Sequence, residues 1–347
     1  MVLLLLCFFG FYIVSFGEVL DHFYYDRLDD NQKTYYDVLS MLNPGDEENT
    51  VVIDLPNSVS GYVGDRAFIG AFFAYGMDHP EDSAWLYAAD AMDSKTFHCL
   101  YEYGLNFDYS EDDAVDDMYL DYLPDIESIR LVLRRRSFAD DVSLAKMHKM
   151  IDYIVNSIDE DSSVEYKAGY IADVLRYWMQ YDYEAVKNPY NIVGQRYVEY
   201  NGDISMSGVY FDEAVDVDLS TSLSIVNGRA ICTGYAHVYK AIADRLGIPC
   251  LIVCSEVHQF NYVQLDDGCW YIVDPQIGSV FFGNDFVEES VDHKVSLPYY
   301  LDGMSGGGHL LLTDYPVLED ESFSFRYNNL ISILSVVSEL NNISLNN

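Results

Sequence analysis

Three side chains in the second half of the chain have the types and the order needed for thiol chemistry: Cys232, His258 and Asp274. Cys232 is expected in the first turn of a helix, where unpaired backbone N–H groups and the positive helix dipole favour thiolate over thiol. His258 would open a strand near that helix end and act as the base. Asp274 would end the neighbouring strand and accept a hydrogen bond from the far imidazole nitrogen, which fixes the ring's tautomer.

Four further residues are expected to surround this constellation without taking part in the chemistry. Gly234 would permit close backbone approach, so that the reacting group of a substrate could reach the sulfur of Cys232. Tyr235, Asn261 and Trp270 would belong to the surrounding shell. The backbone N–H of Cys232 is a natural donor to an oxyanion at a helix start, and the sequence indicates no second donor.

Each of these residues also has a structural interpretation. Cys232 could be a small buried residue, as most cysteines are, His258 a core histidine, and Asp274 the end of a strand. A metal site is a different alternative, and it would use Cys250, Cys254, His258 and Cys269. Strand residues four apart have α-carbons ~13 Å apart, which does not suit the tight turns of structural zinc sites.

One helix followed by an antiparallel sheet would position these residues. The helix is expected over 232–246 and would end at Gly247, with a proline shortly beyond it. Strands would follow over 249–256, 258–265 and 269–275, and Gly268 between the last two predicts a hairpin. Another helix, over 165–181, is expected from apolar residues at helical spacing.

The N-terminal part of the chain is expected to be mainly helical. One helix would start near Asp29 or Asp30, and a helix, a turn and a second helix would span 66–92. A further helix is expected over 126–158. Short strands are expected at 50–55 and 196–200, and a last amphipathic helix at 328–340.

The residues around the three chemical side chains form specific motifs. NGRAICTGYAHVYKAIADRLGIPCLIV contains Cys232, and HQFNYVQLDDGCWYIVDP begins at His258 and contains Asp274. The Cys-x-Gly-Tyr-Ala helix start, the Gly-Ile pair, His-x-x-Asn-x-Val and Gly-x-Trp-Tyr-x-x-Asp-Pro together resemble the transglutaminase-like branch of the papain-type thiol enzymes. The resemblance covers roughly residues 163–283, and Gln259-Phe260 stands where that family usually has Ala-Trp.

The resemblance implies an α+β fold with a papain-like transglutaminase core over 163–315, in which the cysteine helix packs on an antiparallel sheet. Residues 18–160 would form a helical lead-in like that of bacterial exported members, and 316–347 a C-terminal tail with a helix. The implied activity is acyl transfer or hydrolysis on protein or peptide substrates through the Cys-His-Asp triad and a thioester, with water or an amine as acceptor. No metal or other cofactor is implied. A catalytically silent module for surface-protein interaction is the alternative.

The composition favours a folded protein and argues against some partners. The chain has 347 residues, of which 50% are apolar, and this is enough for one large core or two ordinary ones. Its 57 Asp and Glu against 19 Lys and Arg give a formal charge of −38. Such a charge repels phosphate groups, so nucleic acid is not an expected partner, and neither is strong binding to anionic membranes.

The N-terminus has the pattern of an export signal. Residues 2–16 are uncharged and largely apolar, and small residues stand at Ser15 and Gly17. The pattern predicts a signal peptide over 1–17, or an uncleaved anchor, and hence a secreted or cell-surface protein. The cysteines beyond it are Cys99, Cys232, Cys250, Cys254 and Cys269. This odd number suggests a free reactive thiol or an intermolecular bridge, and leaves open whether the others form disulfides or are buried small residues.

Overall fold

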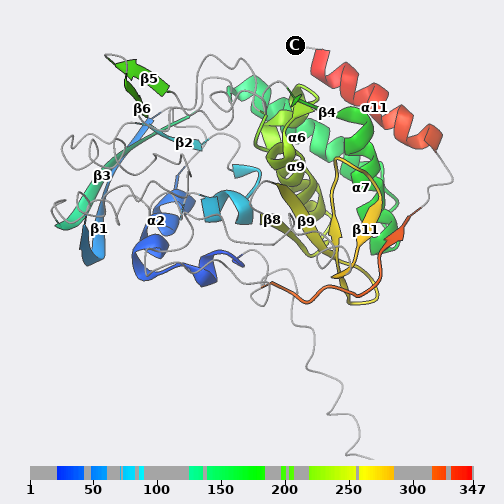
Figure 1. Ribbon diagram of the computed structural model, residues 1–347. Helices are drawn as coiled ribbons and strands as arrows, with labels where there is room; N and C mark the ends of the chain where they lie inside the picture. The colour runs from blue at the N-terminus through cyan, green and yellow to red at the C-terminus, as the bar shows by residue number, and fades with distance from the viewer. Residues whose placement is uncertain are drawn as a thin grey trace, which may run out of the picture.

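The computed structural model describes residues 22–42, 48–60, 71, 73–82, 86–89, 125–135, 139–183, 197–200, 203–206, 219–254, 258–284, 315–325 and 330–345. Within them the chain has the α+β class expected from the sequence, with helices packed on an antiparallel sheet (Figure 1). The expected signal peptide lies outside the described residues. None of the described helices is long and apolar enough to cross a membrane.

A five-stranded antiparallel sheet with the order β12-β11-β10-β9-β8 is the frame of the second half of the chain. Its strands are β8 (Cys250–Cys254), β9 (Gln259–Gln264), β10 (Trp270–Val273), β11 (Val280–Phe282) and β12 (Phe323–Ser324). The first three confirm the strands predicted from the sequence. Gly268, in the hairpin between β9 and β10, has a φ of 79°, which glycine adopts without steric cost. The middle residues of β9 are all buried, so both faces of this strand are covered.

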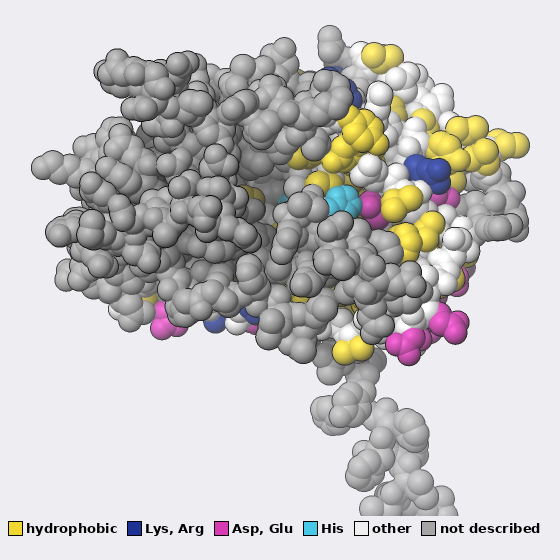
Figure 2. All heavy atoms as spheres, in the orientation of Figure 1, with side chains coloured by type: hydrophobic (Ala, Val, Ile, Leu, Met, Phe, Trp, Pro, Cys, Tyr) yellow, Lys and Arg dark blue, Asp and Glu magenta, His cyan; other side chains and the backbone are white. Residues whose placement is uncertain are grey.

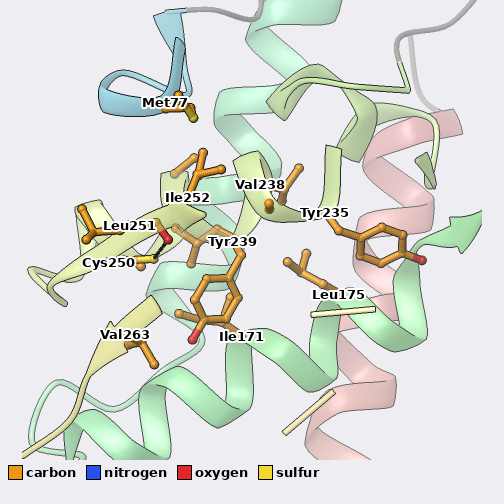
Figure 3. Close-up of a cluster of buried hydrophobic side chains, with 14 of the residues drawn as sticks. Met77, Ile171, Leu175, Tyr235, Val238, Tyr239, Cys250, Leu251, Ile252 and Val263 are labelled. Carbon is orange, nitrogen blue, oxygen red and sulfur yellow. Dashed lines mark hydrogen bonds between the residues drawn. The ribbon is translucent and has the colours of Figure 1, made fainter. Parts of the chain in front are cut away.

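The helix α9 (Cys232–Arg245) carries the candidate nucleophile and is the central helix of the fold. Its residues 234–243 are all buried, because it packs between the sheet and helix α7 (Val164–Trp178). Figure 3 shows Tyr239 of α9 among Ile171 of α7 and Val263 of β9. The hydroxyl of Tyr239 donates to the backbone oxygen of Ala168 in α7, 3.1 Å away, so the contact is polar as well as apolar.

The end of α9 confirms the stop signal predicted at Gly247. The N–H of Ile248 donates to the oxygen of Ala243 at 2.9 Å, and the N–H of Gly247 donates to the oxygen of Asp244 at 3.0 Å. This pair of bonds is the Schellman arrangement, which needs a residue in the left-handed region. Gly247 supplies it with a φ of 67°.

The outer helices α6 (Asp141–Asn156) and α11 (Leu330–Leu345) complete the helical layer, and α11 packs against α6 and α7. The side chains of Asp140 and Ser163 cap the N-termini of α6 and α7. The sequence predicted α11 as an amphipathic helix, and its buried side chains are Ile333, Val336, Leu340 and Ile343. Its outer face exposes Ile331 and Leu334. Figure 2 shows hydrophobic side chains gathered on the surface on the side of the molecule where Figure 1 places α11.

The N-terminal part combines helices with a second sheet. The short helix η1 (Tyr25–Arg27) precedes α2 (Asp30–Ser40), which begins at the predicted place with a capping box between Asp29 and Gln32. The strands of the sheet, in the order β1-β3-β2, are β1 (Glu48–Ser60), β3 (Asp125–Arg135) and β2 (Leu86–Ala89). A small separate hairpin is formed by β5 (Tyr197–Tyr200) and β6 (Asp203–Met206).

The strands predicted at 50–55 and 196–200 are confirmed by β1 and β5. The expectation of a mainly helical region over 18–160 is wrong at β2 and β3. A helix was predicted over 126–158, whereas β3 occupies Asp125–Arg135 and α6 begins only at Asp141. Ile129, Leu131 and Leu133 alternate with other residues at period two, which is the pattern of a strand. Similarly, Leu86–Ala89 lie in strand β2 and not in the second helix expected within 66–92.

The buried carboxylate of Asp78 attaches the N-terminal segment to the rest of the fold. It accepts hydrogen bonds from the backbone N–H groups of Tyr24 and Tyr25, at 3.2 and 3.1 Å, and from the hydroxyl of Tyr36 at 3.1 Å. Burial raises the pKa of Asp78 to about 7. The hydroxyl of Tyr24 in turn donates to the backbone oxygen of Ile252 in β8. The N-terminal segment is therefore bonded directly to the sheet that carries the candidate site.

The left-handed backbone at the end of α9 gives a first testable prediction. Replacing Gly247 by Ala should lower the free energy of unfolding by about 1 kcal/mol, because a Cβ disfavours this backbone conformation. An added Cβ would meet nothing within 4 Å, so the effect is conformational and not steric. Gly247→Asn, the matched control, should lose less in urea denaturation, since asparagine tolerates positive φ. An Ala variant as stable as the wild type would contradict this description of the helix end.

Candidate active site

Cys232 is the first residue of α9, as the sequence predicted. The residue before it, Ile231, is the N-cap, and within the described part of the chain no side chain caps this helix end. The first N–H groups of α9 therefore remain available to a negatively charged atom at the helix start. The sulfur of Cys232 uses this environment, since it receives hydrogen bonds from the backbone N–H groups of Thr233 and Gln259.

His258 connects the thiol to the carboxylate. It lies directly before β9, and its Nε2 atom is 2.8 Å from Oδ2 of Asp274. Its side chain also forms a hydrogen bond with Cys232. Because Nε2 is engaged by the carboxylate, Nδ1 is the ring nitrogen left to face the sulfur. The structure thus brings the three predicted chemical residues together, with His258 between the other two.

Asp274 is fixed by the turn that follows β10. Its Oδ1 atom accepts a hydrogen bond from the backbone N–H of Gln276 at 3.0 Å, and its backbone oxygen accepts from Ile277 and Gly278 at 2.9 and 3.2 Å. The antiparallel pairing of β9 and β10 places the end of β10 beside the start of β9, where His258 lies. Both carboxylate oxygens of Asp274 therefore have hydrogen-bond partners, and these bonds fix the orientation in which the carboxylate faces the imidazole.

Asp173 of α7 holds the far end of the same turn. Its carboxylate accepts hydrogen bonds from the backbone N–H and the hydroxyl of Ser279, at 3.0 and 3.1 Å. Gly278 passes so close to it that an added Cβ would lie 2.7 Å from Oδ1 of Asp173, and its φ is 100°. The helix α7 thereby contributes to the position of Asp274 without touching it.

The electrostatics of the site favour an ion pair of thiolate and imidazolium. Burial opposes ionisation of Cys232, yet the hydrogen bond and the charge of His258 bring the pKa of the thiol below its usual value. Burial likewise opposes protonation of His258, but Asp274 and Cys232 raise the pKa of the imidazole to about 10. Between these two pKa values the sulfur is negative and the ring is positive, which is the state that a thiol nucleophile needs.

The shell residue Gly234 has a different role from the one expected. An added Cβ would lie 2.4 Å from the backbone oxygen of Leu219, 2.8 Å from Oγ of Ser224 and 2.9 Å from the Cβ of Ala230. Gly234 is buried, so it allows the segment before α9 to pack against the helix start. The expectation that it opens a path for the substrate is therefore not supported by its surroundings.

Two other shell residues, Tyr235 and Asn261, connect the elements of the site. The hydroxyl of Tyr235 donates to the backbone oxygen of Met179 at 2.7 Å, which ties α9 to the end of α7. The side-chain nitrogen of Asn261 donates to the backbone oxygens of Ala236 in α9 and Leu251 in β8, at 3.0 and 3.3 Å. Asn261 is fully buried, so it holds the cysteine helix against the sheet.

Trp270 lies away from the triad. It begins β10, whereas Asp274 follows the other end of this strand, and residues four apart in a strand are ~13 Å apart. Its backbone oxygen accepts a hydrogen bond from the N–H of Glu319 at 2.8 Å. Trp270 therefore supports the contact with residues 315–325 and does not line the site.

A residue that the sequence did not single out, Tyr181, lies beside the nucleophile, and after burial the side chain of Cys232 contributes to raising its pKa. The sequence placed Tyr181 at the end of a helix over 165–181. In the structure α7 ends at Trp178, and Tyr181 belongs to the short strand β4 (Gln180–Tyr181), which pairs with β7 (Arg229–Ala230). The aromatic residues near 181 could have indicated a strand. The apolar residues before them recur at helical spacing, so the sequence predicted a helix that continues to Tyr181.

The described side chains do not form the alternative metal site. His258 is engaged by Cys232 and Asp274, and among the described residues no group of His, Cys, Asp and Glu is arranged to hold a metal ion. Cys232, Cys250 and Cys269 carry free thiols. Cys99 and the side chain of Cys254 lie outside what the structure describes. Two disulfides among the four cysteines other than Cys232 are therefore incompatible with the structure.

Two sequence comparisons with known proteins give no match to this chain. No protein-family model matches it, and no curated protein matches it in sequence. What the triad does is therefore inferred from its geometry and from the motifs around it.

The pKa values predict a selective reaction of Cys232 with a thiol-directed alkylating agent. Near neutral pH, iodoacetamide should modify Cys232 on the order of tenfold faster than Cys269, because His258 favours the thiolate of Cys232. A hydrogen bond with Glu319 raises the pKa of Cys269 to about 11, which keeps that thiol protonated. Peptide mass spectrometry over a time course measures both rates in one sample.

The control for this measurement is His258→Ala. Without the imidazolium, burial of Cys232 raises the pKa of its thiol, so its alkylation should slow at neutral pH and recover only in more alkaline solution. Equal rates at Cys232 and Cys269 in the wild type, or a rate at Cys232 that is insensitive to His258→Ala, would show that the thiol is not activated.

Proposed function

We propose that this chain is a thiol-dependent acyl-transfer enzyme, a cysteine peptidase or a protein-glutamine acyltransferase, with a papain-like core of the transglutaminase-like kind. One observation carries the proposal: His258 forms hydrogen bonds with Cys232 and with Asp274 at the start of an uncapped helix. This is the arrangement of nucleophile, base and orienting carboxylate that thiol acyl transfer needs. The motifs around these residues support the same family.

A second cysteine of the same chain provides a useful contrast. Cys250 is buried in β8, and burial raises the pKa of its thiol far above the usual value. That is the behaviour of an inert core cysteine. The pKa of Cys232 is shifted in the opposite direction although its sulfur is also largely surrounded by protein, and the difference is due to His258. This contrast favours an enzyme over a module that keeps the fold without the chemistry.

The first step of the proposed reaction forms a thioester. The thiolate of Cys232 attacks the carbonyl carbon of a glutamine carboxamide or of a peptide bond, and the electron pair of the C=O double bond moves to oxygen. The imidazolium of His258 then gives its Nδ1 proton to the leaving ammonia or amine as the C–N bond breaks. Asp274 keeps the ring oriented through Nε2 and stabilises its positive charge.

The second step releases the acyl group to an acceptor. Neutral His258 takes a proton from water or from an amine, which attacks the thioester carbon, and the C–S bond breaks to restore the thiolate of Cys232. Water gives hydrolysis and a lysine amine gives an isopeptide bond, and the triad serves both. The formal charge of −38 favours the approach of positively charged acceptors. The apolar N-terminal pattern over 1–17 supports action outside the cytoplasm.

Trapping of the acyl-enzyme tests the proposal. The full chain is mixed with a library of glutamine-containing peptides, with and without a labelled primary amine, and is quenched in acid before mass spectrometry. We expect a thioester adduct on the peptide that contains Cys232, and a product that carries either water or the amine. When water and the amine are both present, a product that carries water indicates a hydrolase, and a product that carries the amine indicates a crosslinking enzyme.

The matched control is Cys232→Ala, in which the adduct and the product should both vanish, since no other described thiol is activated. Product formed at the same rate by this variant would contradict the proposal. So would an adduct that forms on another cysteine.

A further inference from the structure

The strand β4 holds Tyr181 beside the candidate nucleophile. Its parallel pairing with β7 aligns Gln180 with Arg229 and Tyr181 with Ala230, two residues before Cys232. The register is fixed on both sides of Tyr181, because the N–H of Gln180 donates to the oxygen of Gly228 at 2.8 Å and the N–H of Asp182 donates to the oxygen of Ala230 at 2.9 Å. Tyr181 is therefore placed by backbone bonds and not only by side-chain packing.

An ion pair and a ring contact reinforce this placement. The guanidinium of Arg229 in β7 donates to the buried carboxylate of Asp182, directly after Tyr181. The ring of Tyr181 stacks near that of Tyr235 of α9, with 6.4 Å between the ring centres. These contacts place the phenol at the start of α9, beside the side chain of Cys232.

The hydroxyl of Tyr181 is a hydrogen-bond donor at neutral pH. Burial, followed by the neighbouring thiolate of Cys232, raises the pKa of Tyr181 to about 12, so the phenol keeps its proton. The neighbouring Tyr235 has a different partner, because its hydroxyl donates to the backbone oxygen of Met179. Of these two stacked tyrosines, Tyr181 is therefore the one that presents an O–H group to the reacting sulfur.

The sulfur does not depend on Tyr181 for its own stabilisation. It already receives hydrogen bonds from His258 and from the backbone N–H groups of Thr233 and Gln259. The hydroxyl of Tyr181 can therefore turn to another acceptor with little loss of stabilisation for the thiolate. Such an acceptor appears during attack, because the carbonyl oxygen is bonded to the carbon that the sulfur attacks and becomes negative next to it.

We propose that Tyr181 is a further catalytic residue, whose hydroxyl donates a hydrogen bond to the oxyanion formed when Cys232 attacks a carbonyl carbon. This role rests on the proposed function. As the C–S bond forms, the electron pair of the C=O double bond moves to oxygen, and Tyr181 stabilises that charge beside the backbone N–H of Cys232 without giving up its proton. When the oxyanion collapses, the C=O bond is restored, the bond to the leaving group breaks, and the hydroxyl no longer faces a negatively charged oxygen.

Two reactions of Cys232 separate this role from simple activation of the thiol. p-Nitrophenyl acetate acylates a thiolate through an oxyanion, and its nitrophenolate leaves without a proton from His258. Iodoacetamide alkylates the same sulfur by displacement at a saturated carbon, so no oxyanion forms. Both rates are measured on the full chain, the first from the release of nitrophenolate and the second by peptide mass spectrometry.

In the variant Tyr181→Phe we expect acylation to slow roughly 100-fold, which is typical for the loss of one oxyanion donor. Alkylation of Cys232 should remain within about threefold of the wild type, because its other hydrogen-bond partners are unchanged. A normal alkylation rate also shows that the site has folded. The matched control is Tyr183→Phe. Tyr183 is 63% exposed and phenylalanine keeps its ring contact with Tyr181, so this variant should leave both rates unchanged.

The possible results distinguish this role from the proposed function. Acylation of Tyr181→Phe at the wild-type rate would overturn the role of Tyr181 and leave the acyl-transfer proposal standing. Equal losses in acylation and alkylation would also overturn it, since they would mean that the hydroxyl acts only on the sulfur. A wild-type Cys232 that is alkylated but never acylated would overturn the proposed function, and the role of Tyr181 with it.

Discussion

The hydrogen bond between His258 and Asp274 is the interaction on which the site depends. It occupies Nε2 of the ring, which leaves Nδ1 for the sulfur of Cys232, and it adds the negative charge that keeps the imidazole protonated. Three parts of the fold converge on this bond. The β9–β10 pairing places the two residues side by side, the turn after β10 fixes the carboxylate, and α7 secures the end of that turn through Asp173. The chemistry therefore depends on contacts between elements that are far apart in the sequence.

The nucleophile is positioned by an equally non-local set of contacts. Asn261 joins α9 to the sheet, Gly234 lets the preceding segment pack against the helix start, and β4 pairs with the two residues just before Ile231. These contacts leave the first turn of α9 facing His258 and Tyr181 rather than a capping side chain. Helix packing, which buries ten consecutive residues of α9 from 234 to 243, gives this arrangement its rigidity.

Local signals allowed much of the site to be predicted from the sequence. Gly247 and Gly268 mark a helix end and a hairpin because their backbones need positive φ, and the strands between them follow from apolar runs. The order of Cys232, His258 and Asp274 then had a simple geometric interpretation.

Other features depend on partners distant in sequence. Nothing local in Gln180–Tyr181 indicates pairing with Arg229–Ala230. The strand β3 is a different case, because its period-two pattern is local but was merged with the helical spacing of α6, which follows closely. Gly234 was identified as special, but its close neighbours, which explain it, are revealed only by the folded chain.

The titration of His258 by NMR tests the central claim most directly. The protein has 8 histidines, so with labelled histidine the resonance of His258 is assigned as the one that disappears in His258→Gln. We predict that this ring stays protonated through neutral pH and titrates near its raised pKa of about 10, and that Asp274→Asn lowers this pKa because the carboxylate charge is removed. A wild-type ring that titrates near the ordinary value of about 6.5, with no response to Asp274→Asn, would contradict the coupling of thiol, imidazole and carboxylate.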